Sequence, residues 1–250
     1  MSAAPVSLRR RVVPATTAVL VVAALAGGAW YAFDAISTQP IERVTFAGNL
    51  QRIAPSDLEA FAVSVRGVNA DGAALAAVRE AARRIPWVRE ATVRRRFPDA
   101  VEVTLETHEP LARWNEGSLV STRGEVFAAD YDGPLPRFHG RESAAPRMAS
   151  EYATIVRMVA PLGATVTDVT LSPRGAWQVA LDSGIVLELG RDDIEARLAR
   201  FAAAWPQVGA RGAASKHADL RYPNGFALAV EAKAAPQPVA VTAKKNKTQR

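Results

Sequence analysis

The alternation of hydrophobic and polar residues divides the chain into an apolar start, a long middle part with mixed periods and a polar end. Residues 12–33 carry no charge, and as a helix they measure about 33 Å, enough to cross a hydrocarbon core of about 30 Å. Three arginines directly precede this run and Asp34 follows it, so the positive charge lies on the N-terminal side. We expect residues 12–33 to span a membrane, residues 1–11 to stay in the cytoplasm, and residues 34–40 to form a linker on the far side.

A cleaved signal peptide is the alternative for this start. A basic beginning, an apolar stretch and the small residues around Ala24 and Ala26 resemble the layout that signal peptidase cuts. The apolar run continues past Trp30, which favours an uncleaved helix. A mature chain that begins at Gly27 in mass spectrometry would exclude the anchor.

The next part of the chain predicts one strand, two helices and two strands. Residues 41–49 alternate like a half-buried strand, and Pro55 opens a segment whose apolar residues recur with the period of a helix. Asn69 or Asp71 can cap a second amphipathic helix, and Val101, Val103 and Leu105 alternate with polar residues after the turn at Pro98. The order β-α-α-β-β predicts a small α+β domain over residues 41–109, with both helices on one face of a three-stranded sheet.

Short strands dominate the remainder, which predicts a β-rich domain with two helices over residues 110–231. Turn residues separate the strands, and a segment rich in Gly and Pro predicts a loop over residues 130–140. The expected helices begin near Arg147 and after Asp193, and the last two strands form a closing hairpin. The expected strands cover 111–115, 118–121, 125–128, 166–171, 176–181, 185–189, 216–222 and 226–230. The last strand is then a candidate edge strand.

The composition of the chain excludes cysteine chemistry and shows where the positive charge lies. The chain has no cysteine, so its stability comes from packing, and disulfide or thiolate chemistry is excluded. The net charge of +6 arises partly from the arginines near the start and from lysines near the end. Residues 232–250 mix Ala, Pro, Lys and Gln without an apolar period, and we expect a disordered basic tail there.

Motifs for catalysis or cofactor binding are missing from the sequence. It has no Gly-Lys-Ser/Thr phosphate loop, no Gly-x-Gly-x-x-Gly and no Gly-x-Ser-x-Gly. His217 and Asp219 share a strand face and could hold a cation, but the solubility of the strand is the simpler explanation. Asp192 and Asp193 are better explained by helix capping than by acid–base chemistry. We therefore predict no catalytic residue, no cofactor and no metal.

The basic run from Arg94 to Arg96 has three interpretations. Binding of nucleic acid requires a cytoplasmic location, which the predicted topology excludes. The second interpretation is that the arginines keep a strand edge soluble and guard it against stray pairing, and the third is that they contact a protein partner. The residues alone leave the last two open.

Several motifs resemble the FtsQ/DivIB family of bacterial cell division proteins. The residues are Ile85–Asp99 (IPWVREATVRRRFPD), Glu109–Asn115 (EPLARWN), Gly190–Asp193 (GRDD), Arg197–Phe201 (RLARF) and Asp219–Tyr222 (DLRY) with Gly225. The resemblance extends from about Ile41 to Val230. It implies one membrane helix, a POTRA domain and a β domain without enzymatic activity.

The resemblance also implies a function and partners. Members of the family are division scaffolds of the inner membrane that hold FtsB and FtsL at the septum, with FtsB adding a strand beside the last strand of the β domain. On matching positions, the residues implied for this contact are Arg174, Arg221, Tyr222, Asn224, Gly225, Phe226 and Val230. Val93 and Arg95 lie where the family is recruited by upstream division proteins. Pro223 and Val230 depart from the family pattern.

Two other classes of function remain as alternatives. A POTRA-containing chaperone or secretion component would handle unfolded β-rich substrates, but such proteins normally repeat the POTRA unit. A membrane-anchored enzyme would need a catalytic constellation that the motif search does not find.

Overall fold

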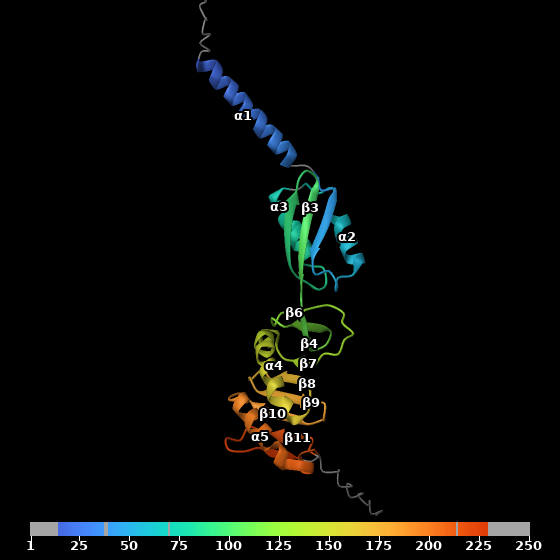
Figure 1. Ribbon diagram of the computed structural model, residues 1–250, viewed down its shortest axis with the longest axis vertical. Coiled ribbons are helices and arrows are strands. Elements are labelled where there is room, and N and C mark those ends of the chain that lie inside the picture. Colours follow the sequence, from blue (N-terminus) through green and yellow to red (C-terminus); the bar gives the residue numbers. More distant parts are fainter. Residues whose placement is uncertain (1–14, 38–39, 70, 214, 230–250) are drawn as a thin grey trace, which may run out of the picture. The chain divides into compact units, whose positions relative to one another are not determined.

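The computed structural model describes residues 15–37, 40–69, 71–213 and 215–229, and the chain forms two compact units, residues 1–108 and 109–250 (Figure 1). The first helix is α1, Ala15–Ser37. It continues into the segment predicted as a linker, and residues 12–14 of the predicted span lie outside the described residues. Among the residues that the structure describes, no helix reaches the length and apolar character that a membrane crossing requires.

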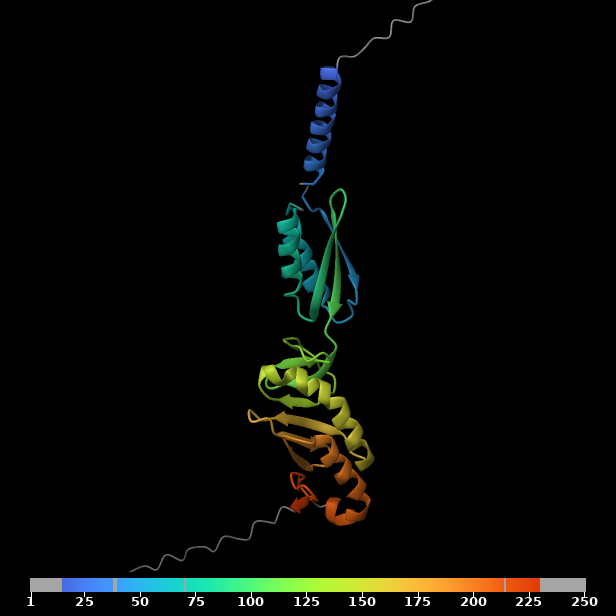
Figure 2. The same ribbon diagram turned by 90° about the vertical axis from the view of Figure 1, so that its left-hand side faces the viewer.

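The globular part of the first unit has the predicted order of one strand, two helices and two strands. The elements are β1 (Arg43–Gly48), α2 (Pro55–Val65), α3 (Gly72–Ala82), β2 (Val88–Arg96) and β3 (Ala100–Thr107). The sheet order is β1-β3-β2, with β1 parallel and β2 antiparallel to the central β3. Both helices lie on one side of this sheet (Figure 2).

Local sequence signals explain how these two helices begin. Pro55 occupies the first turn of α2, where its missing N–H is no loss. The carboxylate of Asp71 accepts a hydrogen bond of 2.7 Å from the backbone N–H of Ala74, so Asp71 rather than Asn69 caps α3. The apolar faces of sheet and helices meet in a core that includes Phe61, Val101 and Val103.

The second unit is built on one nine-stranded sheet with the order β12-β11-β10-β9-β8-β7-β4-β5-β6. Its strands are β4 (Pro110–Trp114), β5 (Ser118–Ser121), β6 (Val126–Phe127), β7 (Arg137–His139), β8 (Val166–Leu171), β9 (Trp177–Leu181), β10 (Val186–Gly190), β11 (His217–Asp219) and β12 (Ala227–Ala229). The mixed α+β class predicted from the sequence is confirmed.

Two long helices cover the core of this sheet. They are α4 (Ala145–Val159), flanked by the short 3-10 turns Glu142–Ala144 and Ala160–Leu162, and α5 (Ile194–Ala213). The two helices lie side by side (Figures 1 and 2). The largest fully buried side chains of the unit, Trp177, Phe138 and Phe201, come from two strands and from α5.

Two predicted boundaries are wrong. The segment predicted as a loop over residues 130–140 contains β7, which pairs in parallel with β4 on one side and with β8 on the other. The closing hairpin is also shorter than predicted, because its strands cover only 217–219 and 227–229. Tyr222 and Phe226 therefore lie in the loop of this hairpin rather than in its strands.

Candidate functional site

The terminal strand β12 is an edge of the large sheet. It pairs with β11 on one side, and its other side has no strand among the described residues. The opposite edge, β6, has two residues. An edge strand presents unpaired backbone groups, which makes it a template for a strand from another chain. The sequence-based expectation that the last strand of the fold is an edge strand agrees with this topology.

The strand β12 is held in place on one face only. Ala218 of β11 pairs with Leu228 of β12; Ala218 is buried, and Leu228 packs against the core of the second unit. The neighbouring residues Ala227 and Ala229 are exposed, as the alternation of side chains in a strand requires. The backbone N–H of Lys216 also donates to the carbonyl of Ala229. The core therefore positions an edge whose other face carries only small side chains.

Phe226 belongs to the core rather than to the exposed surface. Its ring lies 5.0 Å from the ring of Phe201 at an interplanar angle of 87°, and Phe201 in turn contacts Trp205 on α5. This edge-to-face arrangement is favoured between aromatic rings. Of the residues implied for partner contact, Phe226 thus fixes the hairpin to α5.

Tyr222 has the opposite environment, since 55% of its surface is exposed. Its carbonyl accepts a hydrogen bond of 3.1 Å from a guanidinium nitrogen of Arg200, so the backbone is held while the ring remains accessible. A shallow depression of about 390 Å³ lies beside it, lined by Tyr222, Pro223, Asn224, Gly225, Phe226 and Ala227. Val230, the last residue implied for this contact, lies outside the described residues.

Arg221 is fixed by a carboxylate on the preceding strand. Its Nε and one terminal nitrogen donate to the two oxygens of Asp219 at 2.8 and 2.7 Å, and its backbone N–H donates to the same carboxylate at 3.0 Å. This pairing with Arg221 lowers the pKa of Asp219, and the carboxylate in turn raises the pKa of Arg221. The fork geometry presents the guanidinium in one orientation.

Arg174 reaches the same end of the sheet from the turn between β8 and β9, where it is exposed. This turn lies close to Arg191, since a Cβ atom added to Gly175 would be 3.9 Å from Cδ of Arg191. The residue before Arg191 lies close to Arg221, since a Cβ atom added to Gly190 would be 3.3 Å from Cγ of Arg221. Exposed arginines therefore follow one another along this end of the sheet. Arg191 belongs to this row as well, and no local motif marks it, because Arg174 and Arg221 are distant from it along the chain.

The two residues implied for recruitment, Val93 and Arg95, lie on β2, an edge strand of the small sheet. Val93 pairs with Val103 and Arg95 with Val101, so both belong to the face that carries the core. The guanidinium of Arg95 lies 4.6 Å from the centre of the Phe97 ring and donates to the carbonyl of Pro98 at 3.2 Å. Val93 is half-buried, so it offers a partner less surface than the arginines around it.

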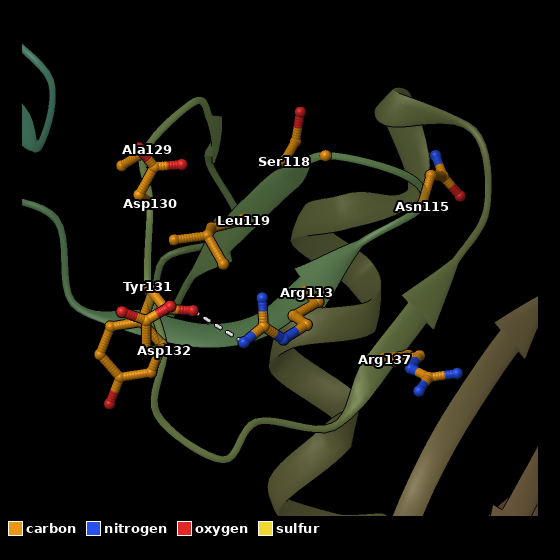
Figure 3. A pocket seen from close by; sticks show the side chains of 10 residues that line it. Arg113, Asn115, Ser118, Leu119, Ala129, Asp130, Tyr131, Asp132 and Arg137 are labelled. Carbon is orange, nitrogen blue, oxygen red and sulfur yellow. Dashed lines mark hydrogen bonds between the residues drawn. The ribbon is translucent and has the colours of Figure 1, made fainter.

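A larger depression, of about 510 Å³, lies at the other end of the second unit (Figure 3). Arg113 crosses it and donates to the carbonyl of Tyr131 at 2.7 Å, while Asp130, Asp132 and Arg137 line its rim. Its charged groups have mixed sign, because Arg113 and Arg137 are cations and Asp130 and Asp132 are carboxylates. In the ranges that the structure describes, no group of three or more His, Cys, Asp or Glu side chains is placed to hold a metal ion.

Comparison with known proteins identifies the family. A family model described as the C-terminal part of cell division protein FtsQ/DivIB matches residues 112–221, and a model described as an FtsQ-type POTRA domain matches residues 39–108. Cell division protein FtsQ of Bordetella pertussis is 38% identical over 242 residues, which cover 86% of this chain and 88% of that protein. The chain belongs to the FtsQ/DivIB family.

Other FtsQ proteins agree with this assignment. The protein from Burkholderia pseudomallei is 46% identical over 158 residues, which cover 60% of this chain and 63% of that protein. The protein from Neisseria gonorrhoeae is 35% identical over 191 residues, which cover 76% of this chain and 79% of that protein. The FtsQ-type POTRA match also gives no support to the alternative of a chaperone or secretion component. The FtsQ/DivIB match ends at Arg221, so the loop from Tyr222 and the strand β12 lie beyond the matched residues.

Proposed function

We propose that this protein is a non-enzymatic scaffold of the divisome that holds FtsB and FtsL through the edge strand β12. The observation that carries the proposal is the position of β12 at the end of the sheet, with one side unpaired among the described residues. A strand of FtsB that pairs there would satisfy the backbone groups of the edge, and neighbouring side chains would fix its register.

The surroundings of the edge supply specificity. The exposed ring of Tyr222 offers a large contact area that loses little conformational freedom on binding, which is typical of an interface hot spot. Arg174 and Arg221 offer cations at the same end of the sheet, and Asn224 and Gly225 line the depression beside the ring. An acidic partner segment would be steered to this end and oriented by these charges.

Copurification tests this mechanism directly. FtsB and FtsL are captured on the full chain in detergent, either wild type or with Tyr222→Ala. We expect the substitution to lower the recovery of FtsB about tenfold or more, because a hot-spot ring contributes at least about 2 kcal/mol. Arg174→Ala should lower recovery less, and its matched control is Arg157→Ala, an exposed arginine on α4. Equal recovery by the wild type and Tyr222→Ala would remove β12 and its loop as the binding site.

The proposed location is the inner membrane at the septum, in a single-pass orientation with residues 1–11 in the cytoplasm and residues 12–33 in the bilayer. Large apolar side chains from Val19 to Leu25 and the rings of Trp30 and Tyr31 are exposed on α1, which suits a lipid environment. Recruitment by upstream division proteins would use the POTRA domain around Val93 and Arg95. A fluorescent fusion should gather at midcell, and an even label around the cell would contradict the division role.

A further inference from the structure

The hairpin between β2 and β3 ends in an exposed aromatic residue among cations. Phe97 has 62% of its surface exposed, which is unusual for a ring in the globular part of the first unit. Arg94, Arg95 and Arg96 directly precede it. A structural role in the core does not explain this ring, because most of the Phe97 surface is exposed.

Contacts at the tip keep one cation next to the ring and pair two others with carboxylates. The guanidinium of Arg95 stacks over Phe97 and is held by the carbonyl of Pro98. Arg96 pairs with Glu102 at 2.6 Å, and Asp99 pairs with Arg43 at 2.8 Å. Four arginines and three carboxylates, those of Glu42, Asp99 and Glu102, therefore lie at this end of the sheet, which leaves a surplus of one positive charge beside an apolar ring.

The register of the sheet places this tip where the chain enters the domain. Arg43, the first residue of β1, pairs with Ala100, the first residue of β3, and the two strands are parallel. The backbone N–H groups of Glu42 and Arg43 both donate to the carbonyl of Asp99 in the hairpin. The segment that arrives from α1 and the tip that carries Phe97 thus lie at the same end of the small sheet.

Covalent geometry limits how far this end can be from the end of α1. The helix ends at Ser37, and Pro40 already forms a bridge with Asn69 of the globular part. Three residues span at most about 11 Å, whatever their conformation. Residues 34–37 add about 6 Å of helix beyond the proposed span, and the headgroup layer on each side of a hydrocarbon core is itself several ångströms thick. A bilayer that contains residues 12–33 therefore lies near the end of the small sheet that carries the hairpin.

We propose that the β2–β3 tip of the POTRA domain docks on the surface of an anionic bilayer, with Phe97 at headgroup level and Arg94 to Arg96 next to lipid phosphates. The inference rests on the membrane anchor of the proposed function. An apolar ring beside arginines suits this interface, because the ring can enter the boundary between headgroups and acyl chains while guanidinium groups bind phosphate oxygens. Such docking would fix the orientation of the POTRA domain above the membrane, which a short linker alone does not do.

The absence of cysteine allows a spin label at one chosen position of the full chain. The chain is reconstituted in phosphatidylcholine vesicles with or without phosphatidylglycerol, and the label is placed by Phe97→Cys, Gln51→Cys or Val22→Cys. Gln51 is the matched control, because it is exposed and follows β1 at the opposite end of the small sheet. The measurement compares collisions of the label with oxygen, which enters lipid, and with a water-soluble nickel complex.

We expect a higher ratio of oxygen to nickel collisions at position 97 than at position 51, and a further rise at position 97 when phosphatidylglycerol is present. Arg94→Gln with Arg96→Gln should remove that rise. Equal, aqueous ratios at 97 and 51 together with a membrane-buried label at 22 would overturn the docking and leave the anchor intact. An aqueous label at 22 would overturn the anchor itself. Protection of position 97 that appears only after division proteins are added would assign the tip to an acidic protein partner and overturn the lipid proposal.

Discussion

Tyr222 and Phe226 lie in the same loop, and their environments differ. The ring of Phe226 packs against Phe201, whereas 55% of the surface of Tyr222 is exposed. The family resemblance implied both residues for the contact with FtsB. No local sequence pattern shows which of the two side chains packs inside the protein. Phe226 packs inward because α5 lies beside the loop. This is a tertiary contact, so the local sequence does not predict it.

Substitution of these two residues should affect stability and FtsB capture in opposite ways. Phe226→Ala removes a half-buried ring from a contact with Phe201, and we expect it to lower the free energy of unfolding by about 2 kcal/mol. Tyr222→Ala should leave unfolding nearly unchanged while it lowers the capture of FtsB. Thermal unfolding of the full chain in detergent, next to the copurification, measures both. The assignment is wrong if Tyr222→Ala destabilises the fold as much as Phe226→Ala does.

At the scale of elements, periodicity predicts most of the fold. The strands β5 and β8 and the helices α2 and α3 follow from alternation, helical stripes, Pro55 and the cap at Asp71. The strand β7 does not, because it has three residues and lies next to Gly and Pro residues that are typical of a loop. Its parallel partners β4 and β8 are distant in sequence, so its pairing depends on the whole sheet.

The candidate site also has one part that the sequence predicts and one part that depends on the whole sheet. A closing hairpin followed from the turn residues Pro223 to Gly225, and its last strand was a natural edge candidate. The neighbourhood of Arg174, Arg191 and Arg221 was not accessible from local sequence, since it results from the order of β8, β9, β10 and β11 in the sheet. The row of arginines at this end therefore results from the order of the strands rather than from any one motif.

At the scale of the molecule, the proposed function assigns attachment and binding to different units. The first unit carries α1 and the POTRA domain, and the second carries the edge strand. A protein that acts by holding partners needs a fixed location and an exposed edge, and it needs no catalytic group. In the proposed function, residues 12–33 supply the location and β12 supplies the edge.

Amide hydrogen exchange of the full chain, with and without FtsB, tests the central claim most directly. Outward-facing amides of an edge strand exchange with water, and pairing with a partner strand slows that exchange. The account predicts new protection in residues 227–229 and unchanged exchange at the opposite edge, in β6. Unchanged exchange in residues 227–229 in the presence of bound FtsB, with protection elsewhere in the chain, would contradict it.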